Sequence, residues 1–84
     1  MPQAADMAIV ERLEQCLSTL EQMPDMPRYD IAWLRLRCRD TLQYHHELQR
    51  ASLRQLQRDV SKFVEAFPNV LPASLVEEVA QTMP

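Results

Sequence analysis

The most unusual feature of this 84-residue sequence is that it contains no glycine. Glycine supplies the positive φ angles and close backbone approaches required by Gly-rich phosphate loops, dinucleotide-binding turns, Asn-Gly hairpins and nucleophile elbows. None of these motifs can form here, so most enzyme classes that are recognisable from sequence are excluded. Helix ends must depend on other residues, and we expect prolines and Asn69 to replace the usual glycine C-cap.

The sequence also lacks long apolar runs and a cysteine framework. The apolar run at residues 7–10 is followed at once by Glu11 and Arg12, so we expect neither a signal-peptide core nor a membrane span. Two cysteines, Cys16 and Cys38, allow at most one internal disulfide, and we predict a cytoplasmic protein with reduced thiols. Neither cysteine has a Cys-x-x-Cys partner, so we predict no metal, cofactor or small-molecule substrate.

A chain of this length can bury only a small hydrophobic core. It buries only about 60% of the surface that the unfolded chain exposes, so a core without other support is marginal. Small scaffolds usually add disulfides, a metal or a partner chain. Because disulfides and a metal are disfavoured here, we expect the chain to be oligomeric or to form part of a complex.

The charges are unevenly distributed, although the net charge is only −3. Residues 1–27 hold one basic and five acidic residues, residues 28–62 hold eight basic and four acidic residues, and residues 63–84 hold three acidic residues and no basic one. The central segment is therefore expected to attract its own flanks or an acidic partner, and the charges of the first and second helices are expected to orient their packing.

Proline pairs at residues 24 and 27 and at residues 68 and 72 divide the sequence into three predicted helices. They span about residues 6–22, 28–66 and 73–82, with Asp6 as the expected first N-cap. Ser74 and Glu77 fit a capping box at the third helix, although Pro72 is an alternative first residue. We predict one all-α domain over residues 1–84, in which a short and a long helix form a hairpin and a short C-terminal helix folds back.

The predicted second helix carries one apolar stripe with a mean spacing of about 3.6 residues, the period of an α-helix. The first helix is less than half as long, so it is expected to cover the stripe only as far as His45, while the third covers it from Leu53 onward. The remaining surface predicts a helix-in-groove contact with a partner. Its expected anchors are Leu34, Leu42, Leu53, Leu56, Val60 and Phe63.

Aromatic and methionine residues gather around the first break, and this cluster is the strongest interaction signal in the sequence. Trp33 lies off the main stripe beside Leu36, so the start of the second helix has two adjoining apolar faces, more than one short helix can bury. Exposed patches of this kind mark partner sites, although core packing is the alternative. The cluster includes Tyr29, Trp33, Tyr44, Met23 and Met26.

Two polar features lie on the predicted long helix. Arg50, Arg54, Arg58 and Lys62 repeat at i+4 spacing, and we call them the basic stripe. This stripe indicates a strip for phosphates or an acidic protein groove, the alternative being a solvated outer face. His45 and Gln49 fall on the apolar stripe, where a polar layer could set helix register or partner choice.

The segment from Pro27 to Leu36 reads Pro-Arg-Tyr-Asp-Ile-Ala-Trp-Leu-Arg-Leu and follows an acidic helix and a proline break. This arrangement resembles the small helical co-chaperones of type III secretion needle subunits, in which a Tyr and an Ala-Trp-Leu-Arg-Leu-like start open the second helix of a hairpin. The likeness covers residues 9–48. It implies a cytosolic protein without catalytic residues that helps a larger chaperone keep a filament subunit unpolymerised.

Taken together, these features predict a non-enzymatic protein-interaction module of the adaptor or co-chaperone type. It would bury an apolar face against a protein partner or a second copy of itself. The alternative is a nucleic-acid-binding regulator that uses the basic stripe, which the net negative charge disfavours.

Overall fold

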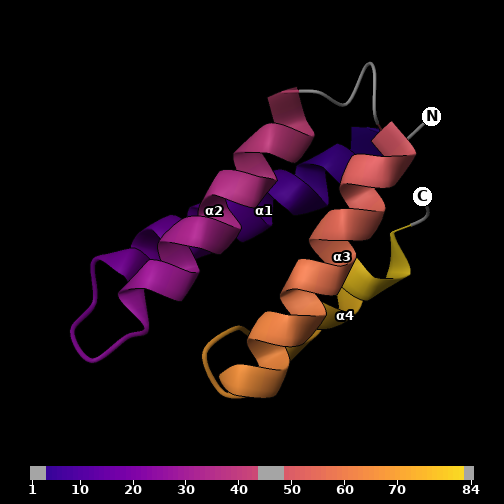
Figure 1. Cartoon of the computed structure of the whole chain (residues 1–84). Helices are drawn as coiled ribbons and strands as arrows, with labels where there is room; N and C mark the ends of the chain where they lie inside the picture. The colour runs from indigo at the N-terminus through magenta and orange to yellow at the C-terminus, as the bar shows by residue number, and fades with distance from the viewer. Residues whose placement is uncertain (1–3, 44–48, 83–84) are drawn as a thin grey trace.

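The chain folds into four α-helices (Figure 1). The computed structural model describes the backbone of residues 4–43 and 49–82 and the side chains of residues 5–43 and 53–82. The helices are α1 (Ala4–Glu21), α2 (Arg28–Gln43), α3 (Gln49–Ala66) and α4 (Ala73–Gln81), and the described residues contain no strand. The all-α prediction is therefore confirmed, and the predicted first and third helices match α1 and α4 to within two residues.

The prediction of one long helix over residues 28–66, and with it a three-helix arrangement, was wrong. α2 and α3 lie side by side rather than end to end (Figure 1). A continuous helix would leave much of the apolar stripe in water, whereas the reversal lets Leu34 of α2 and Leu56 of α3 share one core. Burying each such side chain contributes about 1.5–3 kcal/mol, which exceeds the roughly 1 kcal/mol net value of each helical hydrogen bond given up.

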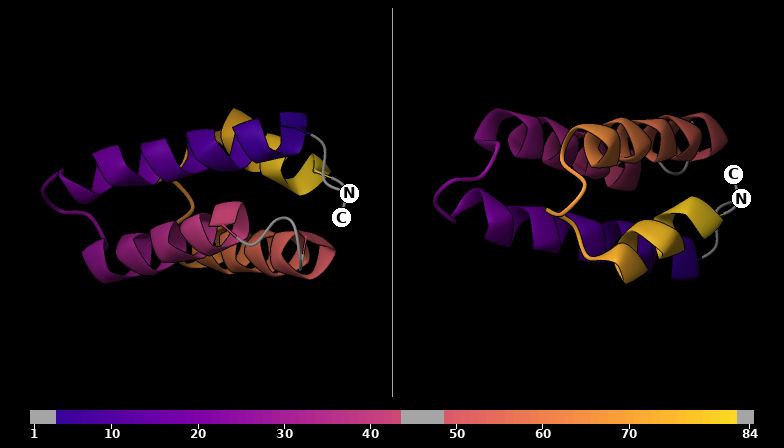
Figure 2. Two further views of the ribbon diagram at one scale, coloured as in Figure 1. Left: turned by 90° about the horizontal axis from the view of Figure 1, so that it is seen from above. Right: turned by 90° about the horizontal axis from the view of Figure 1, so that it is seen from below.

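The four helices form two layers, with α1 and α4 in one and α2 and α3 in the other (Figure 2). α1 contacts α2 and α4, and α3 contacts α2 and α4, so each described helix packs on two neighbours around a common centre. The expected return of the first helix over the start of the second, and of the C-terminal helix over residues 53–67, is confirmed by the α1–α2 and α3–α4 contacts.

The core consists of the apolar side chains that face this common centre. Each helix contributes residues three or four positions apart, which is the spacing that places them on one face. At the end of α3 the ring of Phe63 lies 5.3 Å from that of Phe67, centre to centre. The buried apolar residues are Val10, Leu13, Leu17, Ile31, Leu34, Cys38, Leu53, Leu56, Val60, Phe63, Leu71, Leu75 and Val79.

The loop between α1 and α2 shows how a chain without glycine makes a tight turn. Asp25 adopts a φ of 61° and is the one described residue other than glycine with a positive φ. Aspartate tolerates this left-handed region better than most residues because its short side chain can bond locally to the backbone. Asn69 does not have a positive φ, so the expectation that it would replace a glycine C-cap was wrong.

The other two capping predictions were also wrong. Asp6 lies inside the first turn of α1, where its negative charge still favours the positive end of the helix dipole. Pro72 rather than Ser74 is the N-cap of α4, and no side chain caps that end. Proline preceding the helix, with a φ of −59°, sets the entry of the chain without needing a capping box.

The C-terminal end of α4 is held by a glutamine of α3. The Nε2 amide of Gln57 donates hydrogen bonds to the carbonyl oxygen of Val79, at 3.1 Å, and to the hydroxyl oxygen of Thr82, at 2.9 Å. The backbone N–H and the hydroxyl of Thr82 also donate to the Val79 carbonyl. Carbonyls that the helix end would leave unpaired are thus satisfied, and α4 is fixed to α3.

Candidate interaction surfaces

The exposed side of α2 carries three large apolar side chains in a row, and we call them the α2 aromatic face. Tyr29 is 91% exposed, Trp33 is 49% exposed and Leu36 is 54% exposed. At 100° per residue, positions i, i+4 and i+7 lie on one side of a helix, here opposite the buried Ile31, Leu34 and Cys38. α2 is therefore apolar on both sides, with one side in the core and the other in water.

Trp33 is held in place by a charge from its own helix. The guanidinium of Arg37 lies over the Trp33 ring, 4.9 Å from its centre. Arg37 also faces α3, where its Nε lies 3.5 Å from Oδ2 of Asp59. Asp59 is only 4% exposed, and its Oδ1 accepts a hydrogen bond of 3.0 Å from the amide of Gln55. The aromatic face is thus tied to α3 through one buried carboxylate.

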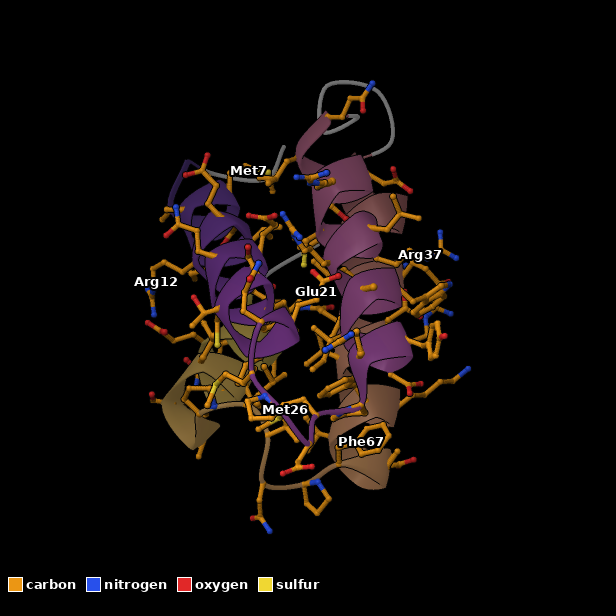
Figure 3. The ribbon with its side chains drawn as sticks, turned by 90° about the vertical axis from the view of Figure 1, so that its left-hand side faces the viewer. Met7, Arg12, Glu21, Met26, Arg37 and Phe67 are labelled. Carbon is orange, nitrogen blue, oxygen red and sulfur yellow. The ribbon has the colours of Figure 1, made fainter. Side chains whose placement is uncertain are left out.

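A second set of charges joins α1 to α2. Arg35 donates hydrogen bonds of 2.8 Å to Glu14 and of 2.8 Å to Glu21, and Figure 3 shows Glu21 between the two helices. These bonds, that to Glu14 first, raise the pKa of Arg35 above its ordinary value. Arg39 lies 3.5 Å from Glu14. The expectation that acids of the first helix pair with arginines of the second is confirmed.

The structure places most of the expected partner anchors inside the protein. Leu34, Leu53, Leu56, Val60 and Phe63 are buried, and Leu42 is partly buried against the same core. They cannot form a partner surface on this folded chain, because the reversal between α2 and α3 has covered them. Tyr29, Trp33 and Leu36 are the expected partner residues that remain exposed. His45, Tyr44 and the side chain of Gln49 lie outside the described residues.

The methionines near the first break divide between surface and core. Met23 is exposed in the loop after α1, whereas Met26 packs partly against the core. The predicted cluster therefore holds together only in part, and its exposed portion is centred on α2.

The basic stripe lies on α3, beside a groove that the sequence did not indicate. Arg54, Arg58 and Lys62 are exposed, and the side chain of Arg50 lies outside the described residues. The three described cations line a groove of about 620 Å³ between α3 and α4. Val76 and Ala80 of α4 supply apolar surface on the other side of this groove. Only the packing of α4 against α3 creates this combination.

Cys16 and Cys38 form no disulfide in this structure. Cys38 is buried, and Cys16 is partly buried against the core. Burial raises the pKa of the Cys16 thiol. Among the residues that the structure describes, no group of three or more His, Cys, Asp and Glu side chains could hold a metal ion. Nothing here marks either thiol as a nucleophile, since a reactive cysteine needs a lowered pKa.

We expect Cys38 to make the fold sensitive to alkaline pH. Burial, with smaller contributions from Glu14 and Asp59, raises its pKa from the ordinary value of 9.0 to about 12. Between these values the unfolded chain loses a proton that the folded chain keeps, so stability falls as pH rises from 9 toward 12, by up to about 1.4 kcal/mol per pH unit. Urea denaturation at several pH values measures this slope. The slope should be shallower in Cys38→Ala, and an unchanged slope would show that other groups cause it.

Comparisons with known proteins yielded no relatives. No family model, no curated protein and no solved structure matches the chain. Within the described ranges, no helix combines the length and apolar character needed to cross a membrane. The function must therefore be argued from the two surfaces described above.

Proposed function

We propose that this protein is a non-enzymatic interaction module that buries the α2 aromatic face against a helix of a partner protein. The observation that carries the proposal is the row formed by Tyr29, Trp33 and Leu36, which is exposed although the same helix already has a complete core-facing side. Contiguous exposed apolar patches of this kind mark interaction sites on small proteins. The regular i, i+4, i+7 spacing matches the way one helix packs along another.

The residue types on this face are those that contribute most to binding energy. Tryptophan and tyrosine are enriched at hot spots because they bury a large area while losing few rotatable bonds. Trp33 is also oriented before any partner arrives, since Arg37 stacks on it and is itself paired with Asp59. Such preorganisation lowers the entropic cost of binding.

The proposed role is cytoplasmic and of the adaptor or co-chaperone type. The hairpin of α1 and α2 spans most of the segment that resembles the co-chaperones of type III secretion needle subunits, and the α2 aromatic face lies within it. The partner is either another protein or a second copy of this chain, and the same face serves both cases. This differs from docking through the apolar stripe, whose residues the core uses.

Site-specific photo-crosslinking tests the proposal without requiring the partner to be known in advance. A photoreactive phenylalanine analogue replaces Tyr29 or Trp33, and the matched control replaces Glu77, an exposed residue of α4. In cells that make the protein natively, we expect a discrete adduct from positions 29 and 33 that position 77 does not give. Light scattering of the purified chain then separates a self-adduct from a partner adduct. Absent adducts, or equal adducts from all three positions, would refute the proposal.

A further inference from the structure

The described charges on α3 differ from most of the other charges of this fold. Arg12 pairs with Glu78, Arg35 with Glu14 and Glu21, and Arg37 with Asp59, so most described cations on α1 and α2 are neutralised by acids of neighbouring helices. Within the described part of the chain, no acid lies within salt-bridge distance of the exposed cations of α3. These are Arg54, Arg58 and Lys62.

These cations are close enough to repel one another, because no acid of the described residues neutralises them. Successive members are four residues apart, so they lie about 6 Å from one another along the helix axis. Like charges at this spacing repel and destabilise a helix by a few tenths of a kcal/mol per pair. An anionic ligand with a matching repeat would remove this repulsion and add favourable contacts.

The groove beside the cations limits the chemistry of such a ligand. Val76 and Ala80 of α4 line it together with the cations, and Glu65 is the one acid among its described lining residues. A simple polyanion would use only the charged rim and leave the apolar surface in water. A ligand that matches both the cations and the apolar surface has acidic groups along one face and apolar groups along the adjacent face.

We propose that the groove between α3 and α4 binds an acidic amphipathic helix of a partner protein. Glutamate or aspartate at positions i, i+4 and i+8 of that helix would repeat about every 6 Å, in step with Arg54, Arg58 and Lys62. Its neighbouring apolar side chains would rest on Val76 and Ala80. This site is separate from the α2 aromatic face, because it is formed by α3 and α4.

Nucleic acid fits the same surface less well. A single strand of DNA or RNA matches the positive charge, but its bases favour aromatic side chains to stack on, and no described aromatic residue lines this groove.

The test uses the full-length chain and a fluorescently labelled helical peptide of about 15 residues. The peptide carries glutamate at three positions spaced by four and leucine on the adjoining face. We expect saturable binding by anisotropy that weakens when salt is raised from about 0.05 to about 0.5 M. A peptide of the same composition, scrambled so that the glutamates share no face, should bind at least about tenfold more weakly.

Single substitutions test whether the peptide binds in this groove. Arg58→Glu and Ala80→Glu, both at exposed positions of the groove, should each weaken binding about tenfold or more. Arg28→Glu makes the same charge reversal at an exposed position of α2 and should leave binding nearly unchanged. Circular dichroism confirms that each variant keeps its helices. No binding, or equal losses in all three variants, would overturn the proposal, and so would tighter binding of a labelled oligothymidine than of the peptide.

Discussion

Replacing Leu56 with alanine is expected to lower the free energy of unfolding by about 3 kcal/mol, as is typical for a fully buried leucine. Leu56 is 1% exposed and packs where α3 meets the core. Proteins of this size have a total stability of only about 4–13 kcal/mol, so the loss is a large part of the whole. Urea denaturation followed by helical circular dichroism measures it.

The matched control is Leu36→Ala, which removes the same atoms from the exposed side of α2. Leu36 is 54% exposed, so its truncation should change stability by no more than about 0.5 kcal/mol. The comparison tests the central feature of the fold, which is that α3 folds back on α2 and encloses its own apolar stripe. Equal costs at both positions would contradict this arrangement.

Replacing Arg37 with leucine is expected to destabilise the protein by about 3 kcal/mol, mainly through the partner that it leaves behind. Asp59 is 4% exposed, and its Oδ2 faces Arg37 Nε at 3.5 Å with no hydrogen bond to any described group. Removing the cation leaves a buried carboxylate supported by Gln55 alone. Uncompensated buried charges are among the most costly defects in proteins.

The double variant Arg37→Leu with Asp59→Leu separates this penalty from lost packing. It should recover most of the stability, since replacing a whole buried ion pair with apolar groups is often neutral or favourable. Trp33 is the only tryptophan of the chain, so its emission reports whether the stacked guanidinium has gone. Figure 3 shows Arg37 on the side of α2 away from α1. A double variant less stable than Arg37→Leu would show that Asp59 stabilises the fold even without Arg37, and would contradict a penalty from an uncompensated carboxylate.

The α1–α2 hairpin is the part of the fold that local sequence signals describe well. Pro24 and Pro27 mark its turn, and Glu14 of α1 forms ion pairs with Arg35 and Arg39 of α2. Proline acts through a missing N–H and a steric clash, which operate over one helical turn and so can be read without the rest of the chain. The proposed interaction residues Tyr29, Trp33 and Leu36 were predicted by the same kind of local argument, from their place in the sequence and on the helix.

The end of α2 at Gln43 had no comparable signal. Residues 44–48 contain neither glycine nor proline, and the spacing of about 3.6 continues across them, although His45 and Gln49 occupy the stripe there. The groove between α3 and α4 and the contact of Gln57 with Thr82 were missed for a related reason. The Gln57–Thr82 contact joins residues 25 positions apart, and although α4 was expected to pack on residues 53–67, a one-dimensional pattern does not report which side chains of the two helices meet.

By itself the sequence determined that this protein is helical, which positions of each helix are apolar, and that no glycine-dependent site exists. Those properties follow from backbone sterics and from the spacing of side chains within one helix. Only the tertiary structure decided whether the apolar stripe of residues 31–67 faces a partner or the chain's own core. That choice depends on the total apolar area removed from water when α2 and α3 pack together, a sum over distant residues. The two surfaces on which the proposed contacts depend, the outer side of α2 and the groove beside α3, are what this packing leaves exposed.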